Sequence, residues 1–507
     1  MPKDIDYLFT KWRQERHGKE NGESMFEALE QKVQIYNDEN EQEGGRAHVQ
    51  RYVSDDDKQN NTWFSNGSQP LVLAACTPIM ARAHQMLRQS GELVYVDATS
   101  SLDRYNCPTF IISTCTPAGG LPLGVVVTSG EDETTITEAL NCLKSVLPQN
   151  AFNGRGPQGP EMCITDDCAA ERAAIHSTWP ETKLFLCIFH YLQSWWTWLW
   201  DGKQGIAKDD RPVLIEMIKK MVFSKSQKDL EERYQSFIKC DHADSYGKKY
   251  PNLVKHLEVF WERRSEWALS FRMEMIFRNN HTNNYAEAAI RVLKEMIFGR
   301  MKAYNLIQMF NFITDTMEKY YKNRFICWIW HIAVIDQVAI SLRFRDVYKL
   351  TNTIVHIEQF SDTIYCVSEE IKGEISEFLV DMEVGTCSCI RGVRGAECKH
   401  QAAIAKNCKI YSVNIPPFFS KTARRTFAIL AVGKSKEMQL EFYADLRDDS
   451  QSPSSNYGVD HDDIEYKQSP NSMEDTSNHI IHLEETMDTE TSDSGEQKPC
   501  RGIARIR

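Results

Sequence analysis

The 507-residue sequence has no apolar segment of the kind expected for membrane insertion or export. Its longest apolar run, Phe325 to Ile335, is far shorter than the roughly 20 residues that a helix needs to cross a bilayer. The first residues, Met1 to Trp12, carry charges and lack the apolar core of a signal peptide. We therefore expect a soluble, intracellular protein without a membrane partner.

The chain also lacks a positive net charge, which at first disfavours a nucleic-acid partner. It has 59 Lys and Arg against 71 Asp and Glu, a formal net charge of −12. Between Asp445 and Pro499 there are 15 acidic and 3 basic side chains, so this segment alone carries the whole imbalance. It is rich in Ser, Thr, Asn and Gln, which predicts a disordered acidic tail over residues 445–507. The net charge therefore says little about what the folded part binds.

Nothing in the composition indicates a fibrous or wholly disordered protein. Hydrophobic residues make up 42% and charged residues 26%, close to the averages of globular domains. At roughly 100 to 200 residues per domain, the length predicts two to four domains, and no repeat is apparent. Fifteen cysteines without an export signal favour thiols or metal ligands over a disulfide framework.

The order of strand and helix patterns after residue 90 predicts a mixed α/β sheet. Three apolar segments separated by Gly, Pro and Asn indicate an antiparallel meander. Alternating helices and strands follow. The expected strands are 93–96, 108–115, 123–128, 162–165 and 183–186, with helices at 134–147 and 169–178. This arrangement is that of an RNase H-like fold, for which we expect residues 91–345.

The flanking regions differ in character. Residues 1–90 read as a polar, partly helical N-terminal region, and the helical pattern from His190 to Phe344 begins with an insertion over about 190–280. Strand signals return at 363–368 and 378–384, joined by a turn that contains Gly373, which predicts a hairpin in a small module over 346–410. Residues 411–444 form a C-terminal extension.

A cysteine and histidine cluster directly follows this hairpin. Cys387, Cys389, Cys398 and His400 have the spacing C-x-C-x8-C-x-H, with glycines in the intervening loop. Three thiolates and one imidazole are a standard ligand set for a closed tetrahedral Zn2+ site, which argues for a structural ion. The alternative is four unrelated residues in a cysteine-rich chain.

Three carboxylates stand at positions where they can converge. Asp97 and Asp166 each end a predicted strand, and Glu287 lies near the start of a helix. Such carboxylates can hold two Mg2+ or Mn2+ ions for phosphodiester chemistry. Each acid also has a structural explanation as a turn or cap residue, Asn284 and Glu287 being spaced as in a capping box. Asp167 is an alternative to Asp166, which we prefer because it directly follows the strand.

The surroundings of these acids resemble the transposase domain of Mutator-like elements. The stretches that carry the resemblance are VYVDATS, CITDDCAAERAAIHSTWPETKLFLCIFHYLQSWW and NNHTNNYAEAAIRVLK, within about residues 91–310. The resemblance implies an RNase H-like fold with a helical insertion and a metal-binding triad of Asp97, Asp166 and Glu287. Cys187 and His190 match a Cys-x2-His pair of that family, with an auxiliary metal role or a structural one.

The downstream cluster resembles the SWIM zinc finger, over about residues 360–410. A preceding strand pair and a following helix near Gln401 belong to that resemblance. It implies binding of DNA or protein partners through the finger. The order of the two resemblances along the chain matches that of Mutator-like transposases.

Aromatic and basic side chains in the helical region offer contacts for nucleic acid. Tryptophans can stack on splayed bases and cations can meet phosphates, although burial in a helical core is the alternative for the tryptophans. The residues concerned are Trp195, Trp196, Trp198, Trp200, Arg263, Arg264, Arg272, Arg278, Arg291 and Lys294. Nearby glutamates balance the basic residues, so no continuous basic stripe is evident.

Three functions are compatible with these patterns. The first is a DDE-type transposase that cuts DNA and joins the freed 3′ hydroxyl to a target. The second is an inactive, domesticated nuclear factor whose zinc finger and acidic tail recruit DNA or proteins, which the lack of N-terminal zinc ligands favours. The third is a metal-dependent nuclease. A nuclear location follows from the proposed chemistry, and the oligomeric state stays open.

Overall fold

The computed structural model describes residues 7–8, 11–15, 21–53, 69–116, 118–238, 246–329, 347, 350–408, 410, 412, 414 and 421–434. The acidic tail predicted from residue 445 lies outside these residues. Within the described ranges, no helix combines the length and the apolar character that crossing a membrane would require.

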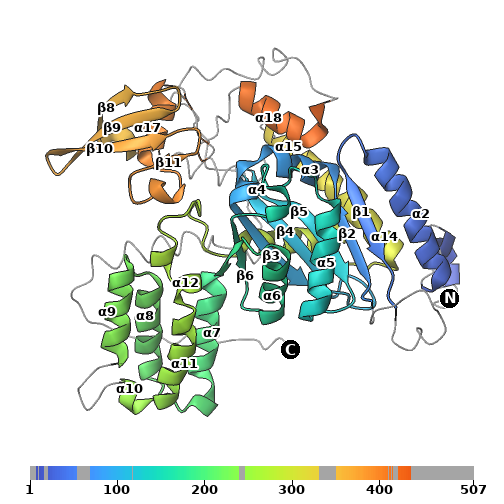
Figure 1. The fold of residues 1–507 in the computed structure, drawn as a ribbon, viewed down its shortest axis with the longest axis horizontal. Coiled ribbons are helices and arrows are strands. Elements are labelled where there is room, and N and C mark those ends of the chain that lie inside the picture. The colour runs from blue at the N-terminus through green and yellow to red at the C-terminus, as the bar shows by residue number, and fades with distance from the viewer. Residues whose placement is uncertain are drawn as a thin grey trace, which may run out of the picture. The chain divides into compact units, whose positions relative to one another are not determined.

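A seven-stranded mixed sheet confirms the predicted α/β class (Figure 1). Its strand order is β1-β2-β5-β4-β3-β6-β7. β3, β4 and β5 pair antiparallel, whereas β3, β6 and β7 pair parallel. The strands are β1 Arg46–Gln50, β2 Val72–Cys76, β3 Leu93–Thr99, β4 Thr109–Thr116, β5 Gly119–Thr128, β6 Met162–Thr165 and β7 Lys183–Leu186.

Short apolar strands flanked by turn residues explain why the centre of the sheet forms as predicted. All of β4 and β6 is buried, and the crossover from β6 to β7 is the helix α6 (Ala169–Thr178). Parallel neighbours require such a crossover. α6 packs beside α5 (Glu133–Val146). Asp132 precedes α5 and caps it, because its side chain accepts a hydrogen bond from the amide of Thr135. Both helices cover one part of the sheet in Figure 1.

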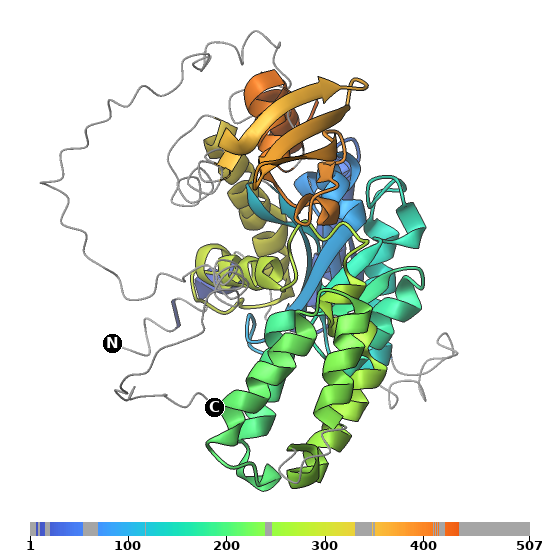
Figure 2. The same cartoon turned by 90° about the vertical axis from the view of Figure 1, so that its left-hand side faces the viewer.

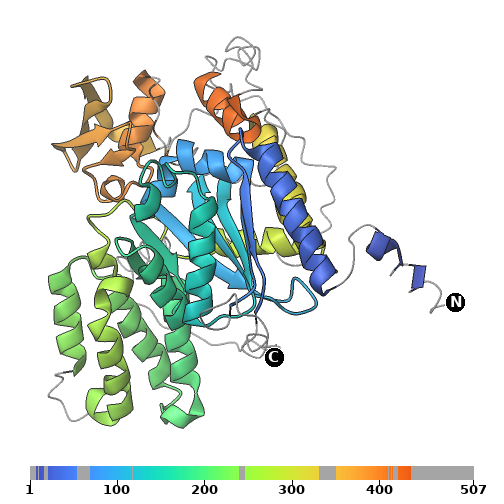
Figure 3. The same cartoon turned by 45° about the vertical axis from the view of Figure 1, so that its right-hand side comes forward.

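Two strands of the N-terminal region, which was predicted to be polar and helical, belong to the sheet. β1 and β2 extend the sheet beyond β5, and the short helices α3 (Pro78–Met86) and α4 (Arg88–Glu92) lead from β2 into β3. α2 (Glu23–Asn40) packs along α14 (Leu306–Asn311), as Figure 3 shows. Tyr36 and Phe310 meet there edge to face, with ring centroids 5.4 Å apart.

The predicted helical insertion has an apolar core of its own. Tyr191 and Trp267 stack with ring centroids 5.0 Å apart, and Trp195 is fully buried beside Phe260. Trp196, by contrast, is 50% exposed. The helices are α7 Ile188–Trp200, η3 Gly202–Gln204, α8 Asp210–Val222, α9 Gln227–Ile238, α10 Tyr246–Lys249, α11 Pro251–Glu262, α12 Arg264–Trp267 and η4 Leu269–Phe271.

The chain then returns to the sheet. α13 (Asn284–Val292) contacts β3, β4 and β5 and continues into the π-helical turn η5 (Leu293–Ile297). A second π-helical turn, η6 (Phe312–Met317), joins α14 to α15 (Glu318–Ile329). α18 (Lys421–Val432) packs on α15 and α3, where Arg82 donates to the carbonyl of Leu430 at 2.8 Å.

A second, four-stranded sheet forms the C-terminal module, residues 350–408. Its strand order is β11-β10-β9-β8, and the helix α17 packs against it (Figure 2). The predicted hairpin is β9 and β10, joined at Lys372 and Gly373, whose φ angles of 53° and 85° are left-handed. Its elements are η7 Leu350–Thr353, β8 Ile354–Gln359, β9 Ile364–Ile371, β10 Glu374–Asp381, β11 Thr386–Cys387, η8 Gly392–Arg394 and α17 Lys399–Cys408.

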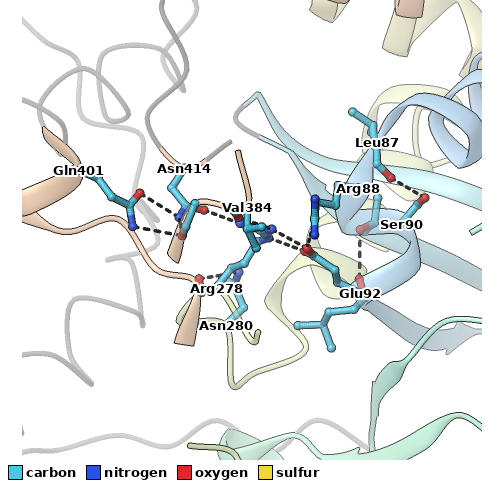
Figure 4. Close-up of polar contacts among 12 residues, drawn as sticks. Leu87, Arg88, Ser90, Glu92, Arg278, Asn280, Val384, Gln401 and Asn414 are labelled. Carbon is cyan, nitrogen blue, oxygen red and sulfur yellow. Dashed lines mark hydrogen bonds and ion pairs between the residues drawn. The ribbon is translucent and has the colours of Figure 1, made fainter. Parts of the chain in front are cut away.

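A buried arginine joins this module to the sheet domain. Nε and Nη2 of Arg278 donate to the two carboxylate oxygens of Glu92, at 2.6 and 2.7 Å. The same guanidinium donates to the carbonyl of Val384 and to Oδ1 of Asn414 (Figure 4). The amide of Arg278 donates to the carbonyl of Arg394 at 2.7 Å. Because Glu92 directly precedes β3, one side chain connects the module to the start of that strand.

We expect Arg278→Ala to destabilise the fold by about 3–5 kcal/mol, because the nearly buried carboxylate of Glu92 loses its buried partner. Arg88→Ala is the matched control: Arg88 contacts the same carboxylate at 3.1 Å but is 39% exposed. Its loss should cost less than about 1 kcal/mol. Chemical unfolding of both variants checks this, and equal losses would contradict it.

Candidate functional site

Two of the predicted acids and Cys187 extend one row across three neighbouring strands. The last residues paired across all three parallel strands are Tyr95 in β3, Ile164 in β6 and Phe185 in β7. Side chains alternate between the faces of a strand, so residues two positions further on return to the same face. Those residues are Asp97, Asp166 and Cys187. All three therefore lie on one face of the sheet: Asp166 and Cys187 directly follow β6 and β7, whereas Asp97 lies inside β3, which continues to Thr99 instead of ending at Asp97 as predicted.

The third acid approaches this face from α13. Tyr285 packs on Tyr95 with ring centroids 5.3 Å apart, and Ala286 is buried among the same side chains. Glu287 follows directly. The helix begins after Asn283, whose side chain makes no cap on its own helix. The capping-box alternative, with Asn284 as the cap, therefore does not describe this helix start.

His190 lies between two of the acids. Its Nδ1 is 2.5 Å from Oδ1 of Asp166, and its Nε2 is 3.6 Å from Oε1 of Glu287. One donor atom each from Asp166, Cys187 and His190 lie within 4.8 Å of one another, a group able to hold a metal ion. Cys187 stands directly before α7 and His190 lies in the first turn of that helix, so the start of α7 supplies both donors.

Asp97, Asp166 and Glu287, together called the acidic site, are carboxylates crowded in a partly buried place, and the pKa values of Asp97 and Glu287 reflect this. Burial, followed by the charge of Asp166, raises the pKa of Asp97 to about 7. Burial also raises the pKa of Glu287, against the opposing effect of His190. The pKa of His190 rises to about 10, chiefly through Asp166 and then Cys187. The protonated imidazolium of His190 offsets the repulsion between the carboxylates.

Glu171 is a further buried carboxyl near this site that sequence reasoning did not single out. It lies in the first turn of α6, is 5% exposed, and its Oε1 accepts no hydrogen bond in the described part of the chain. Burial, followed by Asp166 and Asp97, raises its pKa to about 8. The only signal in the sequence was an acid five residues after Asp166, a spacing that does not by itself place it near the strand end.

The alternative acid, Asp167, faces elsewhere. Its Oδ1 accepts from Nη2 of Arg263 at 2.7 Å, whereas Asp166 contacts His190. Arg263 also holds Glu266 at 2.8 Å. Asp166 and not Asp167 therefore contacts His190, and the choice of Asp166 as a metal ligand stays a prediction.

The donor set of the acidic site fits hard divalent cations. Carboxylate oxygens are the ligands that Mg2+ and Mn2+ prefer. Oε1 of Glu287 is buried and accepts no hydrogen bond among the described residues, so this oxygen is available as a metal ligand. Asp97, by contrast, already accepts from the amide of Ala98 at 2.8 Å. A bound cation would satisfy Glu287 and relieve the repulsion from Asp166, which adds to the effect of burial in raising the pKa of Asp97.

Two of the cations predicted for phosphate contacts are buried and cannot meet a nucleic acid. Arg272 is fully buried and donates to the carbonyls of Leu186, Glu266 and His281. Arg278 is committed to Glu92. The sequence does not distinguish such structural arginines from exposed ones, because their partners lie far away along the chain.

The four predicted zinc ligands converge in the C-terminal module. One donor atom each from Cys387, Cys389, Cys398 and His400 lie within 4.8 Å of one another. The close loop needs glycine at Gly392, where a Cβ would come within 2.3 Å of the Cβ of Cys387. The hydrogen-bonding neighbours of Cys389, first Cys387, lower the pKa of its thiol, which favours the thiolate that binds metals. The cluster can bind a metal ion such as Zn2+.

A carboxylate orients the histidine of this cluster. Nδ1 of His400 faces the sulfur of Cys387 at 3.4 Å, while Nε2 contacts Oε2 of Glu369 at 3.0 Å. Glu369 lies in β9, is nearly buried, and also accepts from Thr353 and Lys399. A carboxylate on the distal nitrogen is the usual support of a metal-binding imidazole. Its position 31 residues before the histidine gave no local signal.

Residues 112–297 match the family model described as Transposase, Mutator family. The matched region contains Asp166, Cys187, His190 and Glu287, while Asp97 precedes it and the Cys/His cluster follows it. The match supports a transposase domain of the Mutator family in this part of the chain. No curated protein matches the chain.

Asp97 should make stability fall as pH rises. Its folded pKa of about 7 exceeds the ordinary value of 3.8, so between these values the folded state holds the extra proton and loses stability as pH increases. We expect Asp97→Asn to weaken this decline when unfolding is measured from pH 4 to pH 7 without added divalent ions. Asp132→Asn is the control, because Thr135 lowers the pKa of Asp132 below its ordinary value of 3.8, so this carboxyl titrates mainly below the measured range and its loss should leave the slope nearly unchanged. A variant Asp97→Asn with the wild-type slope would contradict the account.

Glu369→Gln should weaken zinc binding by about 10- to 100-fold, the usual effect of losing a supporting carboxylate. Competition with a zinc-specific chelator measures the change. Glu377→Gln, on the exposed side of β10, is the matched control and should bind as the wild type does. Equal affinities in all three proteins would show that Glu369 does not support the histidine.

Proposed function

We propose that this protein is a Mutator-like DDE transposase, or a protein derived from one, that cleaves and joins DNA strands. The observation that carries the proposal is the common face of the sheet from which Asp97 and Asp166 emerge, with Glu287 approaching on α13. The match to the Mutator family over residues 112–297 supports the same chemistry.

The strand arrangement supports an RNase H-like domain. Three antiparallel strands are followed by two parallel ones in the order β5-β4-β3-β6-β7, with α6 as a crossover. We propose that β1 and β2 are additions to this core and that helices α7 to α12 form the insertion. His190 lies in the first turn of this insertion, and the remainder of the insertion separates it from Glu287 along the chain while leaving the two side chains together in space.

The residues of the acidic site have distinct roles in the proposed reaction. Asp97, Asp166 and Glu287 would hold Mg2+ or Mn2+, which supplies Lewis-acid activation of the attacking oxygen and charge stabilisation on the leaving oxygen. His190 orients Asp166 and Glu287 and offsets their charge, with Cys187 beside it as an auxiliary donor. Water attacks a phosphorus of the donor strand and breaks its bond to the 3′ oxygen, which frees a 3′ hydroxyl. That hydroxyl then attacks a phosphorus of the target DNA, where a new P–O bond forms and the target's own 3′ oxygen leaves.

The C-terminal module fits a SWIM-type zinc finger. Three thiolates and one imidazole leave no open position on a tetrahedral ion, so the proposed Zn2+ is structural. We propose DNA as the main partner and the nucleus as the place of action, with protein partners at the finger. A tagged protein found only in the cytoplasm would count against this location.

Strand joining tests the proposal when the cognate DNA end is unknown. A library of short duplexes with randomised ends, a plasmid target and Mn2+ would be incubated with the protein, and joined molecules would be sequenced. We expect joined products from the wild type, at least a hundredfold fewer from Asp166→Asn, and near wild-type amounts from the matched control Asp167→Asn. Cut but unjoined DNA would indicate a nuclease instead. The absence of both cut and joined DNA would favour a non-enzymatic DNA-binding factor.

A further inference from the structure

We infer that Asn283 is the positioning residue that holds the three parts of the acidic site in register. This inference rests on the proposed function, because it concerns the same site. Asn283 touches no reacting group itself. It is fully buried at the junction of β3, the end of β7 and the start of α13.

Its side chain binds the strand that carries the first acid. Nδ2 of Asn283 donates to the carbonyl of Val96 at 2.9 Å. Val96 lies one residue beyond the last registered pair of β3 with β6, and Asp97 follows it. The hydrogen bond therefore fixes the backbone of β3 directly before the carboxylate.

Its backbone binds the other two parts of the site. The amide of Asn283 donates to Sγ of Cys187 at 3.2 Å, and Cys187 directly precedes the helix of His190. The carbonyl of Asn283 accepts from the amide of Glu287 at 3.1 Å. One residue thus links Asp97, the Cys187 and His190 pair, and Glu287, which are far apart in sequence.

The hydrogen bonds of the amide indicate a geometric role. Oδ1 of Asn283 is buried and accepts no hydrogen bond within the described residues. A buried amide satisfied at only one end gains little net stability. Asparagine at the start of a helix ordinarily caps that helix, but this side chain makes no cap and reaches the strand instead.

Mn2+ binding to the zinc-loaded full chain, followed by electron paramagnetic resonance, tests the inference. Asn283→Ala removes the donor to Val96. Asn283→Ser does the same but supplies a hydroxyl that can cap α13, so it separates positioning from capping. We expect both variants to bind Mn2+ about 10- to 100-fold more weakly, as when a group that orients metal ligands is lost. Zinc content should not change.

Asn407→Ala is the matched control, because Asn407 also donates from its side chain to a backbone carbonyl, that of Ala403, outside the acidic site. It should bind Mn2+ as the wild type does. Wild-type affinity in either Asn283 variant would overturn the inference and leave the proposed function intact. No Mn2+ binding by the wild type would overturn both. Loss of cooperative unfolding in both variants would show a general structural role and also overturn the inference.

Discussion

The parallel pairing of β3, β6 and β7 is the constraint on which the acidic site depends. Because the three strands run in one direction and share a register, Asp97 within β3 and the residues directly after β6 and β7 lie on one face of the sheet. Asp97 and Asp166 are brought together in this way although β4, β5 and α5 separate them in sequence. A shift of one residue in any strand would turn its functional side chain to the opposite face.

Carboxylates crowded at this edge repel one another when they are ionised, and neighbouring groups reduce this repulsion. The pKa values of Asp97 and Glu287 are raised, and the pKa of His190, between Asp166 and Glu287, is raised as well, which favours the protonated imidazolium. A divalent cation would meet the same need with more charge. Stability and protonation are thus linked at this place, whereas the Cys/His cluster forms a separate group with its own supporting carboxylate.

Local patterns in the sequence predicted the centre of the sheet well. β6, α6 and β7 begin and end at the predicted residues, because apolar runs and turn residues mark their limits. Asp166 and the Cys/His cluster could be selected for the same reason: each follows a clear local signal. The class of the sheet followed from the order of these elements.

The features that were missed depend on partners far away in the chain. β1 and β2 join the sheet through pairing with β5, which no local pattern indicates. Arg278 and Glu92 are 186 residues apart, and their ion pair turns a predicted phosphate contact into a structural one. Asn283 resembles an ordinary helix start until its bond to Val96 is known. Pairing of this kind is set by the tertiary fold and leaves no periodic trace in the sequence.

Anomalous diffraction from crystals of the full chain soaked in Mn2+ would test the central claim most directly. The account predicts Mn2+ peaks among the carboxylates of Asp97, Asp166 and Glu287, and their loss in Asp166→Asn. Mn2+ absent from these carboxylates in well-ordered wild-type crystals, with Zn2+ present at the Cys/His cluster, would contradict a metal-dependent reaction at this site.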